Sequence, residues 1–180
     1  MRAEISYFHS SLTNLVVWAP DFRGIWKPAN LGKSRITGHE EFVEIALLRN
    51  MIRIRYQNSV TDGRNRVVGH NSFNRRLVFT PRYTTSYTVQ ITTGYLGGSY
   101  TVRKVDRAYT NASNTRYYEP YRTDDIALQG KLPLGKHWQI KTHYAVNNLR
   151  DVQYVLLAHY PMPGRQWQVG FSLTYTGNKN

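Results

Sequence analysis

The sequence predicts an all-β protein, a partial antiparallel transmembrane β-barrel of about nine meandering strands. Three observations support this prediction. Apolar and polar residues alternate along most segments, short turns alternate with long polar loops, and the strands run to about ten residues, which suits a tilted membrane strand. The last strand, residues 165–176, shows the alternation most clearly. Successive strand side chains point to opposite faces, so this strand has one apolar, aromatic face and one polar, uncharged face. An edge strand of a soluble sandwich alternates in the same way.

Composition narrows the class of protein. The 180 residues are enough for one domain, and the 14 tyrosines favour strands. The absence of cysteine excludes a disulfide framework and a thiolate metal site. No apolar run is long enough for a transmembrane helix, and the first residues do not resemble a signal peptide, so the chain is either cytosolic or lacks its original N-terminus. A net charge of +13 is compatible with nucleic-acid binding, but the basic residues are scattered.

The connections between the expected strands are sorted by length. Short turns are expected at residues 11–14, 49–50, 97–98 and 134–136, where Gly97-Gly98 has the form of a two-residue hairpin turn. Long polar loops are expected at residues 61–76, 106–120 and 147–165. Short turns at one rim and long loops at the other are typical of outer-membrane barrels. The expected strands are residues 2–10, 15–19, 34–47, 51–59, 83–95, 99–105, 122–132, 138–146 and 165–176.

Two blocks of sequence carry a more specific signal. The first spans residues 7–40 and contains an Asn-x-Gly step and a Gly-x-Glu step, at Asn30, Gly32, Gly38 and Glu40. The second contains Asn147-Asn-Leu-Arg-Asp151 and Tyr160-Pro-Met-Pro-Gly-Arg165, followed by the last strand. In this order and spacing, the blocks resemble the C-terminal barrel portion of the TonB-dependent outer-membrane receptors. The resemblance covers residues 1–180, whereas the family's plug domain and N-terminal barrel strands have no counterpart in the sequence.

The last strand also resembles the signal by which barrel-assembly machinery recognises its substrates. In that family signal a polar residue, a glycine and two apolar residues recur at fixed spacing, and here they are Gln168, Gly170, Leu173 and Tyr175. The usual final residue of the family is aromatic, whereas this chain continues through Thr176 to Asn180.

The resemblance implies a function and a set of partners. It implies an outer-membrane receptor fragment for energy-coupled uptake of a scarce nutrient such as a metal chelate or cobalamin. The implied partners are outer-membrane lipid, the missing plug domain and barrel strands, a TonB-type energy-coupling complex acting through the plug, the barrel-assembly machinery and a small-molecule ligand. No nucleic acid and no cofactor are expected. Two alternatives stay open: a small stand-alone outer-membrane barrel or pore, and a soluble basic β-sheet module that binds nucleic acid.

The sequence contains no catalytic constellation. The six histidines are dispersed without metal-ligand spacing, and Asp124 and Asp125 are adjacent, so their side chains would point to opposite faces of a strand. No catalytic, cofactor-binding or metal site is therefore predicted, and the protein is not expected to be an enzyme.

Aromatic and basic residues supply the candidate functional positions. An interfacial aromatic girdle is predicted from Trp18, Tyr95, Tyr100, Trp138 and Trp167. Five arginines that border one long loop are predicted either to contact an anionic ligand or lipid phosphates, or to be solvated loop charges: Arg64, Arg66, Arg75, Arg76 and Arg82. Basic residues on the polar strand faces are expected to line the lumen, where they either tune the pore or pair with the plug, and Glu40 and Glu44 are their candidate partners in the chain: Arg53, Arg55, Lys131 and Lys141.

Overall fold

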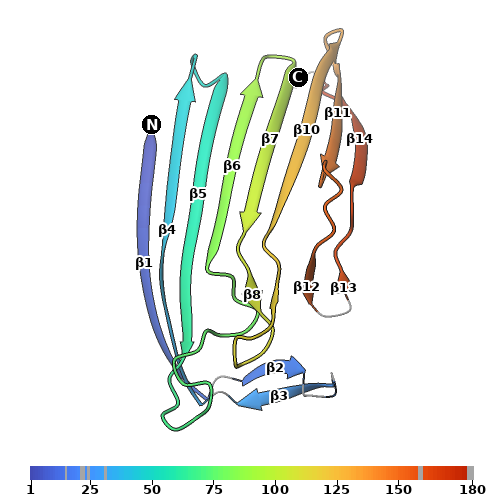
Figure 1. Cartoon of the computed structure of the whole chain (residues 1–180). Helices are drawn as coiled ribbons and strands as arrows, with labels where there is room; N and C mark the ends of the chain where they lie inside the picture. The colour runs from blue at the N-terminus through green and yellow to red at the C-terminus, as the bar shows by residue number, and fades with distance from the viewer. Residues whose placement is uncertain (15, 21–22, 24, 31, 158–159, 178–180) are drawn as a thin grey trace.

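The computed structural model shows one open, curved, antiparallel sheet of eight strands (Figure 1). It describes the chain except for residues 15, 21–22, 24, 31, 158–159 and 178–180. The strands lie in the order β1-β4-β5-β6-β7-β10-β11-β14, so β1 and β14 form the two edges. In the described residues, no helix with the length and hydropathy of a membrane span occurs. The strands of this sheet are β1 (Arg2–Thr13), β4 (Lys33–Leu47), β5 (Ile52–Asn65), β6 (Tyr83–Thr92), β7 (Leu96–Val105), β10 (Tyr121–Leu134), β11 (Trp138–Asn147) and β14 (Gln166–Tyr175).

The connections are sorted by length between the two rims of the sheet, as the sequence predicts. Short turns join β4 to β5, β6 to β7 and β10 to β11 at one rim, where β1 also begins and β14 ends (Figure 1). The four long connections all lie at the opposite rim. Three of them carry small two-stranded hairpins, formed by β2 (Val16–Pro20) with β3 (Trp26–Asn30), β8 (Ala108–Tyr109) with β9 (Tyr117–Tyr118), and β12 (Val155–Leu157) with β13 (Tyr160–Pro161).

The structure corrects the expected second strand. Residues 11–13 do not turn but continue β1, in which Leu12 and Thr13 pair with Ser34 and Lys33 of β4. The strand ends at Thr13, and the next residue, Asn14, has a left-handed φ of 58°, a conformation that asparagine tolerates better than most residues. Of the expected strand at residues 15–19, residues 16–19 lie in the β2–β3 hairpin instead, and residue 15 lies outside the described residues. A short alternating segment can form a strand of the main sheet or a strand of a separate hairpin. Its pairing partner, which the sequence does not show, determines which of the two it forms. The sheet therefore has eight strands rather than about nine.

The expected turn at Gly97-Gly98 is also wrong. The β6–β7 turn comes earlier, where the amide of Thr93 donates to the Leu96 carbonyl at 2.7 Å and Thr93 Oγ1 accepts from the Leu96 amide at 2.9 Å. Gly97 and Gly98 lie within β7, opposite Gln129 and Leu128 of β10. A Cβ atom on Gly97 would lie 2.5 Å from Gln129 Nε2, so glycine here makes room for a neighbouring side chain.

The expected loop at residues 61–76 is shorter than predicted. Residues 61–65 extend β5, because they pair with β4 as far as Ser34. The loop that follows is ordered by side chains: Asn65 Nδ2 donates to Ser72 Oγ at 2.6 Å, and both residues are buried.

Strand register divides the sheet into an apolar face and a polar face. One continuous ladder across five strand pairs of the apolar face consists of Ile54, Val89, Tyr100, Ile126, Val146 and Trp167. The next residues along the same strands are polar: Arg55, Thr88, Thr101 and Asp125 form one ladder, and Asn147 pairs with Gln166. Residues of the polar face make up most of the lining of two hollows of about 460 and 360 Å³.

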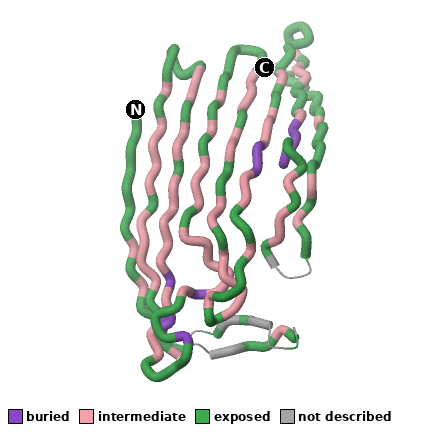
Figure 2. Tube along the Cα trace, viewed as in Figure 1, coloured by how far each residue is buried: buried purple, intermediate pink, exposed green. Residues whose placement is uncertain are grey.

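Most of the large side chains on the apolar face are exposed, although Val146 of the apolar ladder is buried. Among the described residues, the buried apolar side chains are only Leu77, Ala145 and Val146, and buried positions are sparse along the chain (Figure 2). In contrast, Val169 is 79% exposed and Phe171 is 86% exposed. A face that exposes many neighbouring large apolar side chains is typical of an interaction or membrane surface rather than of a soluble monomer. The partial transmembrane barrel predicted from the sequence is confirmed as the fold class.

Candidate functional site

Aromatic side chains lie at two levels of the apolar face. Near the short-turn rim, Trp138 and Tyr175 have ring centroids 4.8 Å apart. Toward the long-loop rim, the rings of Tyr144 and Trp167 are 5.9 Å apart. Eight residues separate Trp167 from Tyr175, which is about 27 Å along a strand. A strand tilt of roughly 40° reduces this to about 21 Å, close to the roughly 25 Å apolar band of an outer-membrane barrel.

The structure separates the predicted girdle residues into three groups. Trp138 and Trp167 lie near the ends of the apolar face, as a girdle requires, and Tyr95 lies in the β6–β7 turn. Tyr100 lies on the same apolar ladder as Trp167 but in the interior of the sheet, between Val89 and Ile126, whereas Trp167 lies on the edge strand β14. Trp18 lies on β2, outside the eight-stranded sheet, where it is 60% exposed. The alternation of residues around Trp18 predicted a strand, but it did not indicate that this strand belongs to a separate hairpin.

A buried carboxylate marks the long-loop end of the apolar face. Asp124 on β10 has no exposed surface. Its Oδ1 accepts two hydrogen bonds from Arg122, at 2.8 and 3.1 Å, and its Oδ2 forms an ion pair with Arg150 from the long β11–β14 connection. The backbone carbonyl of Asp124 also accepts from the amide of Leu149 at 2.7 Å. The carboxylate therefore holds the start of that connection against the sheet.

The second resemblance block forms the two ends of that connection. Asn148 Oδ1 accepts from the Val152 amide at 3.0 Å, and Asn148 Nδ2 donates to the Val152 carbonyl at 2.9 Å. Asp151 Oδ1 accepts from the Arg165 amide at 2.7 Å. A Cβ atom on Gly164 would overlap the same carboxylate oxygen, which explains glycine at this position. These contacts join the two ends of the connection just before the last strand begins. Residues 148–152 and 164–165 together are called the clasp below.

Aromatic residues connect the long loops to one another, and the sequence prediction did not identify them as a cluster. Phe79 of the β5–β6 connection stacks on Trp26 of β3, with centroids 5.5 Å apart, and lies 6.2 Å from Tyr118 of β9. A second stack joins Tyr121 of β10 to Tyr154 at 4.2 Å. The high tyrosine content of residues 106–120 was the available signal, but partners from other loops could be assigned only in three dimensions.

A hollow of about 300 Å³ opens among these aromatic residues. The Tyr118 phenol in the wall of the hollow is neutral at physiological pH, and burial raises its pKa further above its ordinary value. Arg107 lies nearby in sequence, with its guanidinium carbon 4.9 Å from the centre of the Tyr117 ring. The hollow is lined by Phe79, Pro81, Val105, Asp106, Ala108, Tyr118, Tyr121, Val155 and Leu156.

Three of the five predicted loop arginines make contacts that order the loops. Arg64 Nε donates to Asp62 Oδ2 at 2.8 Å, and Arg66 donates to Asn74 Oδ1 at 2.9 Å. The backbone of Arg76 is bonded in both directions by Asn114, at 2.8 and 3.1 Å, which joins two long connections.

The other two loop arginines differ from these. The Arg82 guanidinium lies over the Tyr83 ring, 5.0 Å from its centre. The Arg75 side chain is exposed, and among the described residues it makes no polar side-chain contact. Contact of the five arginines with an anionic ligand or lipid phosphates remains a prediction.

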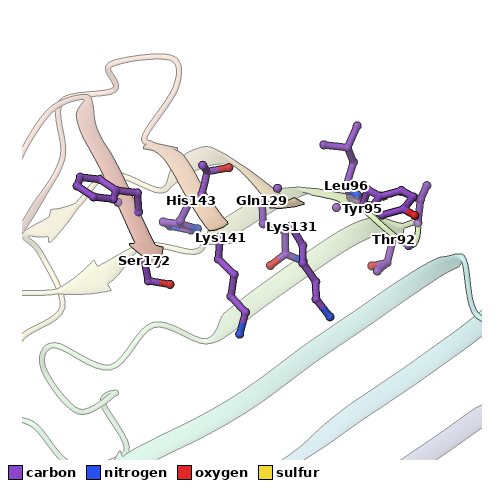
Figure 3. A pocket seen from close by; sticks show the side chains of 15 residues that line it. Thr92, Tyr95, Leu96, Gln129, Lys131, Lys141, His143 and Ser172 are labelled. Atoms are coloured by element: carbon purple, nitrogen blue, oxygen red, sulfur yellow. The ribbon is translucent and has the colours of Figure 1, made fainter. Parts of the chain in front are cut away.

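The basic residues expected to line the lumen all lie on the polar face. Arg55 donates to Glu44 Oε2 at 2.6 Å, so one of the expected acidic partners is in place. Lys131 and Lys141 are directly opposite each other on β10 and β11. Figure 3 shows the two ammonium groups extending in the same direction, while Leu96 points the opposite way. No cluster of three potential metal-ligating side chains occurs in the part of the chain that the structure describes.

The residues of the predicted assembly signal all lie on β14, at an edge of the sheet. Gln168 and Gly170 belong to the polar face, and Leu173 and Tyr175 to the apolar face. The spacing of the signal thus presents two residues to each face of an edge strand.

Neither protein-family models nor curated proteins match this sequence. Solved structures do match its fold. BauA, the ferric preacinetobactin receptor from Acinetobacter baumannii, aligns with a TM-score of 0.77 and 15% identity over 96% of this chain and 27% of BauA. The unliganded ferric citrate transporter FecA aligns with a TM-score of 0.77 and 13% identity over 97% of this chain and 29% of FecA. The ferric yersiniabactin uptake receptor FyuA from Yersinia pestis aligns at 0.68 with 18% identity.

These matches agree with the resemblance found in the sequence, and at this identity they concern the fold. The chain spans between a quarter and a third of the length of the receptors it matches. Its open sheet, with two unpaired edges, corresponds to a section of a larger closed wall. This chain therefore has the fold of part of the β-barrel of the TonB-dependent outer-membrane receptors.

Proposed function

We propose that the chain is the C-terminal barrel section of a TonB-dependent outer-membrane receptor that takes up a scarce nutrient, such as a metal chelate or cobalamin. The observation that carries this proposal is the combination of a largely exposed apolar face with eight strands whose connections are sorted by length. The structural match to receptor and transporter barrels supports the same class.

The long-loop rim is proposed as the side that meets the ligand. It contains the aromatic hollow of about 300 Å³ and the basic residues of the neighbouring loops. Aromatic walls with nearby guanidinium groups suit a ligand that combines apolar or aromatic groups with negative charge. The similar structures include receptors for ferric preacinetobactin and ferric yersiniabactin, which supports a metal chelate as the ligand class.

The remaining partners follow from the open form of the sheet. Strand edges are not tolerated in lipid, because their backbone groups would lack hydrogen-bond partners. The unpaired edges of β1 and β14 are therefore proposed to pair with the remaining barrel strands. In this arrangement the polar face surrounds a plug domain, through which a TonB-type complex supplies energy. The barrel-assembly machinery would recognise β14 during insertion into the outer membrane.

Both alternative functions fit the structure less well. A stand-alone pore requires a closed barrel, whereas β1 and β14 lie at opposite ends of the strand order. A soluble nucleic-acid-binding module would have to expose the apolar face to water, including Phe171 at 86% exposure. Hydration of such a face is unfavourable and promotes aggregation.

The proposal is tested by the size and location of the natural product. Isolated outer membranes are probed with an antibody against a C-terminal peptide of this chain. We expect a band several times larger than 21.0 kDa in the membrane fraction. A membrane band at 21.0 kDa would instead support a small barrel, and a signal confined to the soluble fraction would contradict membrane insertion altogether.

A further inference from the structure

The apolar face changes in character towards the long-loop rim. Beyond the apolar ladder, the next row of register partners on this face contains Tyr56 and Tyr87, whose ring centroids are 5.3 Å apart, and ends at Asp124. The row after that contains Lys104 of β7 and Arg122 of β10, which are directly opposite each other. Apolar, aromatic and then basic side chains along one face are typical of a surface that passes from the lipid interior to the lipid headgroups.

The basic row lies at about the depth of the headgroups. Arg122 lies four residues beyond Ile126, which is on the same ladder as the predicted girdle residue Trp167. Four residues cover about 13 Å along a strand, and a tilt of roughly 40° reduces this to about 10 Å along the membrane normal. The headgroup layer on each side of a bilayer is about 5–8 Å thick, and long basic side chains can bend towards it. The basic row is therefore within reach of lipid phosphates.

Three basic side chains lie close to one buried carboxylate. Asp124 has no exposed surface, whereas the side chains of its partners Arg122 and Arg150 are 40% and 57% exposed. The contacts with Asp124 use Nε and Nη2 of Arg122 and Nε of Arg150, so both guanidinium groups keep N–H donors for a ligand. Lys104 is exposed and, in the described part of the chain, has no ion-pair partner. Asp106, two residues further along, lies in the lining of the aromatic hollow.

The charge of this cluster favours a phosphomonoester. Three cations against one carboxylate leave two positive charges uncompensated. A phosphomonoester carries about −1.5 to −2 charges at neutral pH and presents three acceptor oxygens, whereas a phosphodiester carries about one negative charge. Guanidinium groups bind phosphate oxygens in pairs, and an ammonium group adds a point charge.

The surface next to the cluster favours a lipid over a free phosphate. On the side towards the apolar ladder, Tyr87, Val89 and Tyr100 are 46%, 41% and 37% exposed. Acyl chains that pack against these side chains would bury apolar surface, which inorganic phosphate does not do.

We infer that Lys104, Arg122 and Arg150 form a binding site for the phosphomonoester headgroup of a lipid, in the leaflet on the side of the long loops. The phosphate oxygens accept hydrogen bonds from the two guanidinium groups and lie against the Lys104 ammonium group. Because Arg150 belongs to the β11–β14 connection, a bound lipid also ties that connection to β7 and β10. The inference rests on the proposed function for the membrane that supplies the lipid, and the site itself requires only residues of this chain.

The test uses the full chain, refolded in zwitterionic phosphocholine micelles that contain a small fraction of short-chain phosphatidic acid. The ³¹P NMR shift of the phosphomonoester measures binding at constant ionic strength. We expect saturable binding that weakens at least tenfold in the Lys104→Gln, Arg150→Gln double variant. Lys104→Gln alone leaves both ion pairs of Asp124 in place and should weaken binding at least threefold, so a misfolded double variant does not prevent the test.

The matched control removes the same charge at the opposite rim. It is the Arg49→Gln, Lys136→Gln double variant, in which both residues come from exposed turns, and it should change the affinity less than twofold. No saturable binding of phosphatidic acid would overturn the inference. Equal weakening in the control and in the Lys104→Gln, Arg150→Gln variant would also overturn it, because binding would then depend on overall charge.

Two further probes test the chemistry of the ligand. Short-chain phosphatidylglycerol, a phosphodiester, should bind at least fivefold more weakly than phosphatidic acid, and equal affinity would overturn the assignment to a phosphomonoester. Inorganic phosphate should bind at least tenfold more weakly than phosphatidic acid, because it lacks acyl chains. Phosphate binding as tight as that of the lipid would assign the site to free phosphate and overturn the inference of a lipid site.

The outcome is separable from that of the proposed function. Binding of phosphatidic acid in micelles does not depend on the natural location or length of the protein. A chain that binds this lipid but is absent from outer membranes contradicts the receptor proposal alone. A receptor-sized band in outer membranes, together with no lipid binding, contradicts the phosphate site alone.

Discussion

The Asp151 carboxylate accepts a hydrogen bond from the backbone amide of Arg165, with 2.7 Å between Oδ1 and N. This bond joins the two ends of the long connection between β11 and β14, immediately before β14 begins. Asp151 has a left-handed φ of 56°, which aspartate and asparagine tolerate better than alanine does. The clasp therefore depends on both the oxygen acceptor and the backbone preference of this residue.

The Asp151→Ala variant is expected to loosen the clasp. It removes the acceptor and strains the backbone, for a combined loss of about 1–3 kcal/mol of local stability. Limited proteolysis of the refolded chain should then cut the connection at residues 148–165 several times faster than in the parent. Asp151→Asn is the matched control, since it keeps an acceptor oxygen and the same backbone preference. Equal cleavage rates in the alanine variant and the parent would refute this role.

A second prediction concerns Gly38, on the polar face of β4. The Phe8 ring of β1 covers this position, so a Cβ atom would lie 2.5 Å from Phe8 Cζ and would also overlap the carbonyl oxygen of Val60. Gly38→Ala should destabilise the β1–β4 edge by roughly 1–3 kcal/mol, because the ring and the backbone must both move. Urea unfolding measures the loss. Gly94→Ala is the control, since nothing lies within 4 Å of its added carbon, and a loss as large there would contradict the argument.

The two faces of β14 should respond in opposite ways to a charge. Phe171 lies on the apolar face and Ser172 lies next to it on the polar face. An arginine at the centre of the lipid-facing side costs about 2–4 kcal/mol. Phe171→Arg should therefore sharply reduce the fraction of refolded chain that floats with liposomes, whereas Ser172→Arg should leave it within about twofold. Equal flotation of both variants would mean that the apolar face does not meet lipid.

The fourth prediction concerns depth in the membrane. Trp138 and Trp167 lie at the two ends of the apolar face, so both should be shallow. In variants that keep one tryptophan, lipids brominated near the headgroup should quench either residue more strongly than lipids brominated near the chain end. Phe171→Trp, in a background without other tryptophans, provides the reference for the middle of the apolar face and should show the reverse order. Deep quenching of Trp138 or Trp167 would remove that residue from the girdle.

The alternation within single strands was sufficient to predict the fold class and the residues of the apolar face. In β14, Trp167, Val169 and Phe171 point to one side because strand geometry has a period of two, whatever the neighbouring strands are. The sorted loop lengths could also be read from the sequence, since turn residues mark both kinds of connection. The resemblance blocks then indicated a family whose barrels match this fold.

Tertiary structure decided which segments pair with one another. Val16–Pro20 alternates like a wall strand but forms a hairpin with β3, and Gly97-Gly98 has the form of a turn but accommodates Gln129. The loop contacts of Phe79 with Trp26 and Tyr118 join residues far apart in the sequence. Periodicity fixes only the direction of a side chain relative to its own backbone. Partners, register and the Lys131–Lys141 pair depend on contacts between strands, which the tertiary structure alone specifies.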